Sequence, residues 1–292
     1  MKFLLIGHYA VDVFHLTRGR TDERPGGILN SAVALAGIVG EKDRIVPVCG
    51  VHEGDYDALI ERLAAFPVID SSGVFKTPSA TNCVEYYPQE GGTVAACPKV
   101  IAPPIPFERI RPFLGVGGVL VNMVSGEDIT LETLDQIRMA VRSDAIPLHL
   151  DLHNLTLGVN EKQERYRRPV EQWRRWAFMI DTIQCNEAEI AGLTVERLPE
   201  NRTAGHLLTL GVKGVVVTRG GNGASLYCNE HKNLVRKDFP TTNGIRATVT
   251  VGAGDAFGAA FHHCFVTAHD LAAATEAGLH AGSAFLAGRE TA

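Results

Sequence analysis

The sequence lacks the features that mark several large classes of protein. Its 292 residues carry a formal net charge of −5, and no apolar run approaches the length that crosses a membrane. Without an excess of positive charge, no global field recruits nucleic acid or an anionic membrane. The six cysteines form no C-x-x-C pair and no zinc-ligand spacing, which is typical of reduced, mostly buried thiols. We therefore expect a cytoplasmic protein without nucleic-acid or membrane partners.

Two further absences concern the start of the sequence and its organisation. The apolar run that begins at Met1 stops at Gly7, which is too short for the core of a signal peptide and fits a first buried strand. The residues that follow read Gly7-His8-Tyr9-Ala10, not G-x-G-x-x-G, which argues against a dinucleotide-dependent dehydrogenase. No internal repeat and no long linker divides the chain, so we expect a single domain over residues 1–292.

What the sequence does contain is a regular alternation of short apolar runs and helical patterns. Within residues 53–66, for example, Tyr56, Leu59, Ile60 and Leu63 recur at helical spacing. Nearly continuous apolar strands separated by helices are typical of a mostly parallel sheet covered on both faces. Strands are predicted over residues 3–6, 45–49, 119–123, 147–151, 178–184, 214–218 and 225–228, and helices over residues 53–66, 131–141 and 202–210.

Residues 77–100 break this alternation. A first extended run ends at Pro88, and the pair Gly91-Gly92 separates it from a second run, with no helical pattern between them. This order indicates a β-hairpin outside the parallel sheet, to which residues 10–16 could add a strand. We expect such strands within residues 8–25 and 75–100, where they form a lid over a site, an edge used in a dimer contact, or both.

A late small-residue motif carries the strongest indication of chemistry. Gly252-Ala253-Gly254-Asp255 follows Thr250 and opens a good helical sequence. Small residues let the main chain approach a ligand closely, and the first amides of a helix are free to bind an anion. Asp255 could then accept the proton of a hydroxyl that attacks a phosphoryl group held there. Alternatively, Asp255 is an acidic residue that stabilises the start of a helix.

A second motif lies near the N-terminus. Gly26-Gly27 precedes a helix whose first turn contains Asn30, and Asp12 follows the first predicted strand. A carboxylate, an amide and bare main chain form a suitable set for binding the hydroxyls of a sugar. The alternative interpretation is a glycine turn and an asparagine at the start of a helix.

Two motifs follow predicted strands in the second half of the chain. Asn186 and Glu189 lie on one face of a first helical turn and could act near a metal ion and phosphates, or simply cap the helix. The segment from Thr218 through Gly220 to Gly223 is either a tight turn between strands or a loop that borders a nucleotide.

These segments, in this order, resemble the ribokinase-like (PfkB) carbohydrate kinase family over nearly the whole chain. The family pattern has a Gly-Gly…Asn helix, a mid-chain N-x-x-E, a T-x-G-x-x-G turn and a late G-A-G-D helix, and Asp151-Leu-His-Asn154 resembles its central D-x-N segment. The resemblance implies an α/β fold: a Rossmann-like, mostly parallel three-layer sandwich with a small β-flap lid. It also implies a kinase that uses ATP and Mg²⁺ to phosphorylate an alcohol group of a small sugar or sugar-like acceptor.

The resemblance further implies a role for each motif. Asp255 would be the general base, and an anion hole would be formed by the amides of Gly252, Ala253 and Gly254. The acceptor would be bound by Asp12, Gly26, Gly27 and Asn30. The nucleotide would be bordered by Asn186, Thr218, Gly220, Gly223 and, in the last helix, His280. Glu189 would act on Mg²⁺ through water. Because dimers through the flap are frequent in this family, a homodimer through the lid is a further expectation.

The sequence also departs from the family pattern. Val249 stands where the family usually has an aspartate that helps to hold a monovalent cation, so potassium activation is not expected. Three arginines precede Gly26: Arg18, Arg20 and Arg24. They either bind an acidic or phosphorylated acceptor or form a solvated loop. A nucleoside acceptor, and a binding protein that has lost catalysis, remain open alternatives.

Two other clusters are interpreted as structural. His262, His263 and Cys264 are adjacent and therefore point to different faces of a helix, which indicates packing and not a metal site. Trp173 and Trp176 lie in the arginine-rich segment 165–175, which is predicted to be an exposed helix face.

Overall fold

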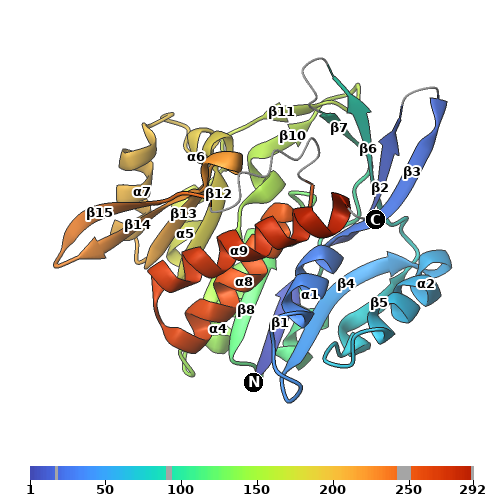
Figure 1. The fold of residues 1–292 in the computed structure, drawn as a ribbon, viewed down its shortest axis with the longest axis horizontal. Helices are drawn as coiled ribbons and strands as arrows, with labels where there is room; N and C mark the ends of the chain where they lie inside the picture. Colours follow the sequence, from blue (N-terminus) through green and yellow to red (C-terminus); the bar gives the residue numbers. More distant parts are fainter. Residues whose placement is uncertain (17–18, 90–93, 242–250, 291–292) are drawn as a thin grey trace.

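The computed structural model describes residues 1–16, 19–89, 94–241 and 251–290. Arg18, the pair Gly91-Gly92, Val249 and Thr250 lie outside the described residues. Within the described part, the chain forms a nine-stranded sheet, a four-stranded sheet and a two-stranded sheet (Figure 1).

The nine-stranded sheet runs through the centre of the molecule and is mostly parallel (Figure 1). Its strand order is β15-β14-β13-β12-β9-β8-β1-β4-β5, with β14 and β15 antiparallel to their neighbours. The chain passes from β1 to β4 and β5 and later returns to β8 on the other side of β1, so the strand order reverses between β1 and β8. The strands are β1 (Lys2–Ile6), β4 (Arg44–His52), β5 (Val74–Thr77), β8 (Gly118–Asn122), β9 (Leu148–Asp151), β12 (Thr182–Asn186), β13 (Gly214–Thr218), β14 (Ala224–Glu230) and β15 (Asn233–Phe239).

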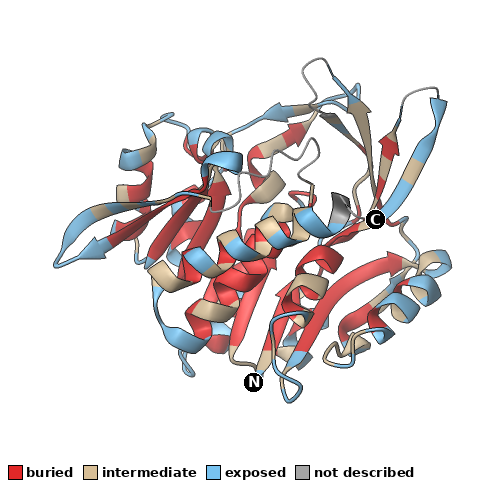
Figure 2. Ribbon diagram, viewed as in Figure 1, coloured by how far each residue is buried: buried red, intermediate tan, exposed pale blue. Residues whose placement is uncertain are grey.

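Both faces of the central strands are buried, as Figure 2 shows. In β1, Phe3 and Leu5 pack into one core cluster, whereas Leu4 and Ile6 pack into another, because successive side chains of a strand point to opposite faces. The helices that contribute to these clusters are α1 (Ile28–Ala36), α2 (Glu53–Ala64), α8 (Ala253–Ala268) and α9 (Leu271–Glu290) on one face, and α3 (Phe107–Ile110), α4 (Leu131–Val141), α5 (Trp173–Phe178), α6 (Glu187–Leu193) and α7 (Glu200–Thr209) on the other. The predicted three-layer α/β fold is therefore confirmed.

The four-stranded sheet projects beside the main sheet (Figure 1). Its order is β3-β2-β6-β7, with β2 and β6 parallel and two antiparallel hairpins on either side. The strands are β2 (Tyr9–His15), β3 (Thr21–Gly27), β6 (Asn82–Pro88) and β7 (Val94–Val100). The rings of Phe14 and Tyr86 stack at a centroid distance of 4.7 Å and join the two hairpins. β2, β6 and β7 lie within the two regions where the sequence predicts such strands, residues 8–25 and 75–100, and β3 begins in the first region and ends at Gly27.

The charged segment before Gly26 is only partly the predicted solvated loop: Arg20 is exposed and lies outside any strand, whereas Arg24 is exposed but lies in β3. Residues Thr21–Gly27 pair in register with β2, which supplies the hydrogen bonds that the segment alone does not specify. Arg24 donates to the Asp22 carboxylate at 2.6 Å, and its guanidinium lies 5.4 Å from the centroid of the Phe14 ring. Charged side chains on the outer strand of a small sheet are common, because they discourage pairing with other chains.

The arginine-rich segment also differs from its prediction as one exposed helix face. It begins with strand β11 (Arg165–Arg167), which pairs with β10 (Leu157–Val159) in the two-stranded sheet, and it continues into α5. Trp173 and Trp176 are buried in the main core, with exposed fractions of 3% and 7%. Their apolar area outweighs the charge of the neighbouring arginines, which pair with carboxylates at the surface.

The boundaries of one predicted strand are also wrong. The apolar pattern predicts an extended run over residues 178–184, but α5 continues to Phe178, and β12 begins only at Thr182. Phe178 is 61% exposed, so its apolar character does not report burial in the sheet. No helix of the described residues is both long and apolar enough to span a bilayer.

Candidate active site

The candidate site lies where the N-terminal end of α8 meets the carboxyl ends of strands β8, β9 and β12. Asn122, Asp151 and Gln184 lie at or near these strand ends, and Gln184 donates to the main-chain oxygen of Gly254 at 2.9 Å. In open α/β sheets, ligands bind at the carboxyl ends of the strands, next to the point where the strand order reverses. Here that point lies between the paired strands β1 and β8, and α8 packs against β8.

Asp255 occupies the first turn of α8 with an exposed fraction of 3%. Its Oδ2 accepts a hydrogen bond from Asn30 Nδ2 at 2.9 Å, and its Oδ1 accepts one from Asn122 Nδ2 at 2.7 Å. Two amide donors from different elements therefore hold the carboxylate in one orientation. Each oxygen keeps a lone pair that can accept a further proton.

The main chain in front of Asp255 carries only small side chains, and Gly254 is exposed there. Gly252 is the N-cap of α8 with φ of 92°, and no side chain caps the helix. The first amides of a helix have no partner within it, so those of Ala253, Gly254 and Asp255 are available to an anion. A Cβ atom at Gly252 would lie 2.7 Å from the ring of Phe285 and 3.0 Å from Asn30 Nδ2, so this position requires glycine.

The N-terminal motif lies on the other side of Asp255. A Cβ atom at Gly26 would lie 2.1 Å from Asp12 Oδ2, so the buried Asp12 carboxylate lies directly against the main chain of Gly26. Gly27 has φ of 62° and is the N-cap of α1, in which Asn30 follows. Because Asn30 also bonds to Asp255, the structure brings this motif and the α8 motif together.

Tyr86 of β6 connects the small sheet to these carboxylates, although no motif in the sequence pointed to it. Burial raises the pKa of Tyr86, and the nearby carboxylates of Asp12 and Asp255 raise it further. Its hydroxyl also donates a hydrogen bond to Asp12. The only local indication in the sequence is an aromatic residue in a strand of the predicted flap.

Asn186 and Glu189 form a reciprocal capping box at the start of α6. Asn186 Oδ1 accepts from the Glu189 amide at 2.9 Å, while Glu189 Oε2 accepts from the Asn186 amide at 2.8 Å and Oε1 from Asn186 Nδ2 at 2.6 Å. The helix-capping interpretation is therefore confirmed, and it does not exclude a second role. Burial raises the pKa of Glu189, and the neighbouring His153 opposes this.

Direct binding of a metal ion does not fit these residues. Within the described residues, no group of three or more histidine, cysteine, aspartate or glutamate side chains is arranged to hold a metal. Each Glu189 oxygen accepts one hydrogen bond from Asn186 and retains one lone pair. The donor set fits an indirect contact, through water, with a metal that phosphates hold.

His153 and Asp151 lie between the α8 and α6 motifs. Burial opposes protonation of His153, but the carboxylates of Asp255, Asp151 and Glu189 outweigh it and raise the pKa of this imidazole. Its Nε2 lies 3.7 Å from Asp255 Oδ1. Burial raises the pKa of Asp151 well above its ordinary value. The resemblance drew attention to Asp151, but no local signal identified His153 or Gln184.

The Thr218–Gly223 segment forms a tight turn between β13 and β14. Gly220 and Gly223 have φ of 54° and 95°, and a Cβ atom at Gly223 would lie 1.9 Å from the main-chain oxygen of Phe239. Thr218 lies beside Asn186 in the parallel ladder of β12 and β13. The structure thus brings the turn and the α6 motif to the same edge of the sheet.

His280 is the predicted site residue that stands apart. It is exposed on α9, two positions before Gly282, where a Cβ atom would lie 3.2 Å from the main-chain oxygen of Ala253. Its helix therefore packs against the start of α8, but the His280 side chain faces solvent.

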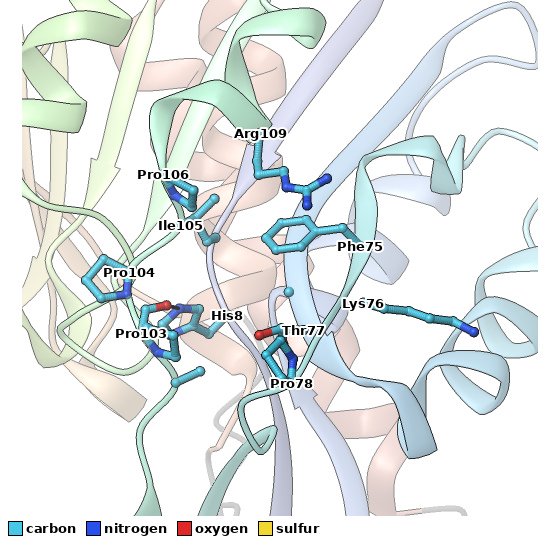
Figure 3. A pocket seen from close by; sticks show the side chains of 12 residues that line it. His8, Phe75, Lys76, Thr77, Pro78, Pro103, Pro104, Ile105, Pro106 and Arg109 are labelled. Carbon is cyan, nitrogen blue, oxygen red and sulfur yellow. Dashed lines mark hydrogen bonds between the residues drawn. The ribbon is translucent and has the colours of Figure 1, made fainter.

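A separate cavity of about 310 Å³ lies where the chain passes between the two larger sheets (Figure 3). It is lined by His8 after β1, by Thr77 at the end of β5 and the following Pro78, and by residues 102–106 after β7. His8 is buried and contacts Ser125 Oγ at 3.0 Å and the main-chain oxygen of Pro103 at 3.1 Å. None of the predicted site residues lines this cavity.

The comparisons agree with the fold and with the α8 motif. The model of the pfkB family carbohydrate kinases matches residues 160–292, which include that motif. No curated protein sequence matches the chain.

Solved structures of ribokinase-family kinases are similar over almost the whole chain. A pyrophosphate-dependent kinase of this family in complex with sulfate is 16% identical, with a TM-score of 0.77 over 98% of this chain and 95% of that chain. Ribokinase from Thermotoga maritima is 21% identical, with a TM-score of 0.71 over 98% and 92%. Arabidopsis thaliana ribokinase complexed with ribose and ATP is 18% identical, with a TM-score of 0.72 over 98% and 91%. At these identities the likeness establishes the ribokinase-like fold.

The family model matches the part of the chain that carries the α8 motif, and the ribokinase-like fold extends over the rest. The chain is thus similar to the pfkB family of carbohydrate kinases over residues 160–292 and has the ribokinase-like fold.

Proposed function

We propose that this protein is a carbohydrate kinase that transfers the γ-phosphoryl group of ATP to an alcohol group of a small sugar or sugar-like acceptor, with Asp255 as the general base. The observation that carries the proposal is the buried Asp255 carboxylate, which two amide donors orient at the open N-terminal end of α8. A base in this position can accept the acceptor's hydroxyl proton while the amides of Gly252, Ala253 and Gly254 stabilise the charge of the transferring group.

The acceptor would bind between the small sheet and Asp255. Asp12 can accept hydrogen bonds from sugar hydroxyls, Asn30 can both donate and accept, and Gly26 and Gly27 leave the main chain uncovered. The nucleotide would lie on the other side of Asp255. Asn186, Thr218, Gly220 and Gly223 support this placement, because β12 and β13 bring them to one edge of the sheet. His280 is the least supported member of this set, since it faces solvent.

Mg²⁺ bound to the phosphates would neutralise charge that develops during transfer. Glu189, with a free lone pair on each oxygen, would orient water on that ion without binding it directly. The small sheet would act as a lid that excludes water from the closed site. The free thiols and the net charge of −5 fit a cytoplasmic enzyme without nucleic-acid or membrane partners, and a homodimer through the small sheet is part of the same proposal.

The test is an acceptor screen with purified protein. ADP release from Mg-ATP is followed with pentoses, hexoses, sugar acids, sugar phosphates and nucleosides, and phosphate release is followed with pyrophosphate as the donor. Pyrophosphate is included because a structural neighbour uses it. ADP release that depends on one acceptor and is lost in Asp255→Asn would support the proposal. A nucleoside as the only acceptor, or ATP binding without any product, would contradict it.

We expect Gly26→Ala to raise the KM for the acceptor by about 10–100-fold, the worth of one hydrogen bond to a charged group. The new methyl group would stand where Asp12 Oδ2 now lies and would displace this carboxylate. The φ of Gly26 is not in the left-handed region, so alanine fits the backbone itself. The matched control is Gly37→Ala at the end of α1, where a Cβ atom would lie 3.6 Å from its nearest neighbour. An unchanged KM in a folded variant would argue against Asp12 as an acceptor ligand.

We expect Glu189→Gln to weaken the apparent affinity for Mg²⁺ at fixed ATP by about 10–100-fold, the usual effect of losing a group that orients metal-bound water. Glutamine keeps part of the capping box, because its oxygen still accepts from the Asn186 amide. Its NH₂ group replaces the oxygen that accepts from Asn186 Nδ2, so the melting temperature should fall slightly. Glu187→Gln, in the same helical turn but 60% exposed, is the control. Equal Mg²⁺ dependence in the two variants would leave Glu189 with a capping role alone.

A further inference from the structure

Arg165 begins strand β11 in the two-stranded sheet, which contacts β7 of the small sheet (Figure 1). Its side chain is half-buried and lines a cavity of about 220 Å³ together with Ile101, which follows β7, and Arg168. The cavity thus lies between the β10–β11 hairpin and the end of the small sheet. Arg165 is therefore not a fully exposed surface charge, because its side chain is half-buried and lines a cavity.

The guanidinium of Arg165 has no ion-pair or hydrogen-bond partner in the part of the chain that the structure describes. Two carboxylates act on it electrostatically, those of Asp128 and Glu127, but both are already bound by other donors. Asp128 Oδ1 accepts from the His8 amide at 2.6 Å, and its Oδ2 accepts from the Ser125 amide at 2.9 Å.

Glu127 Oε1 accepts a hydrogen bond from Arg168 at 2.8 Å, so the Glu127 carboxylate already has an ion-pair partner. Burial of Arg165 lowers the pKa of its guanidinium, and the charge of Asp128 only partly offsets this. A half-buried cation without a partner destabilises the folded chain, and an anionic ligand would remove that penalty.

The position of Arg165 relates it to the acceptor and not to the nucleotide. The charge of Arg165 acts on Tyr86. The Tyr86 hydroxyl donates a hydrogen bond to Asp12, and the charge of Asp255 also acts on it. Tyr86 lies on β6, which pairs with β7, and β7 contacts β11, the strand of Arg165. Asn186 and Thr218 lie beside each other on β12 and β13, within the main sheet.

We propose that the acceptor of this kinase carries an anionic group, a carboxylate or a phosphate monoester, which Arg165 binds while Asp12 and Asn30 bind its hydroxyls. This inference rests on the proposed function, because it names the class of molecule that enters the same acceptor site. A guanidinium is suited to such a group, since it can donate two parallel hydrogen bonds to the oxygens of one carboxylate or phosphate.

The test compares acceptors that differ only in the anionic group. kcat/KM is measured for D-gluconate against D-glucitol and for D-fructose 6-phosphate against D-fructose, in the wild type and in Arg165→Gln. Binding of the same four compounds is measured by calorimetry without nucleotide. The control is Arg142→Gln, an exposed arginine at the C-terminal end of α4.

We expect the wild type to prefer the anionic member of one pair by about 10²-fold, and Arg165→Gln to lose that preference while kcat/KM for the neutral member changes by less than about 3-fold. The gluconate and fructose 6-phosphate arms decide between a carboxylate and a phosphate. The binding measurement should show the same loss, and Arg142→Gln should behave as the wild type does.

Each of the following results would overturn the inference: a neutral acceptor preferred by the wild type, an equal loss for both members of a pair in Arg165→Gln, or a KM increase for the donor alone. Failure of the proposed kinase reaction would look different. Anionic sugars would then bind to the wild type and not to Arg165→Gln, yet no member of the panel would be phosphorylated. Absence of both binding and turnover for every anionic member would also overturn the inference.

Discussion

Replacement of Asp255 by asparagine is expected to lower kcat by about 10²–10⁴-fold, the usual worth of a positioned general base. The substitution keeps the size of the side chain and removes its ability to take up a proton at neutral pH. ATP affinity should be largely retained, because the amides of the α8 N-terminus bind through the main chain. Steady-state kinetics at saturating acceptor, with ATP binding by calorimetry, measures both effects.

One structural consequence of this substitution is specific to the site. Asn30 and Asn122 both direct an Nδ2 donor at the carboxylate, so the amide introduced by Asp255→Asn would turn its own NH₂ group against one of them. One of the two asparagines must rotate its amide, and the melting temperature should fall slightly. Asp144→Asn, at an exposed carboxylate, is the matched control. Near-normal turnover in a folded Asp255→Asn variant would remove Asp255 from the role of base.

The second large effect is expected on stability in acid. His149 and His262 are completely buried, and their rings stack at a centroid distance of 5.8 Å. Burial lowers the pKa of His262 to about 3, and His263 contributes to this. Burial and the neighbouring His262 lower the pKa of His149 well below its ordinary value. Neither ring nitrogen of His262 has a hydrogen-bond partner among the described residues.

The sign of the effect follows from these directions. Below pH ~6.5 the unfolded chain takes up protons on both histidines, whereas the folded chain cannot do so until the pH is far lower. The free energy of unfolding therefore falls as the pH decreases from neutrality. Between pH 7 and pH 5 the loss is about 2 kcal/mol for each histidine, by the same linkage.

His262→Leu isolates this contribution, because other groups of the protein titrate with opposite sign. The raised pKa of His153, for example, adds stability as the pH falls. Urea unfolding at pH 7, 6 and 5 should show a loss that is smaller by about 2 kcal/mol in His262→Leu than in the wild type. His231→Gln serves as the exposed control. Parallel pH curves for wild type and His262→Leu would show that His262 is protonated in the folded state.

The sequence predicted those strands whose conformation depends on their own residues, and it was less successful for strands that depend on contacts with distant residues. Residues 3–6 and 214–218 are predictable as strands because both their faces are mostly apolar, and all of these residues except the half-buried Thr218 are buried in the structure. β3 was predicted only as part of the region 8–25 and not from its own residues, because Thr-Asp-Glu-Arg-Pro has little strand preference. Its extended form depends on pairing with β2, which is a contact and not a property of the segment.

The residues of the candidate site also fall into those that the sequence could identify and those that only the structure revealed. Gly252, Asp255, Gly26 and Asn30 could be proposed from the sequence, because a glycine turn that opens a helix has a local signature. Asn122 could not, since one polar residue at the end of an apolar strand has many explanations. Its significance appears only when β8 is placed next to β1, so that its amide meets Asp255.

The properties of residues close together in the sequence were thus sufficient to predict the fold class, the order of the motifs and the two glycine-rich helix starts. Backbone conformation, burial on both faces of a strand and helix capping are properties of neighbouring residues, and a sequence displays them directly. The partners of Asp255, the contact between Asp12 and Tyr86 and the unpaired charge of Arg165 join residues that are far apart in the chain. Such contacts depend on strand order and register, which are set by the packing of the whole chain and not by any one segment.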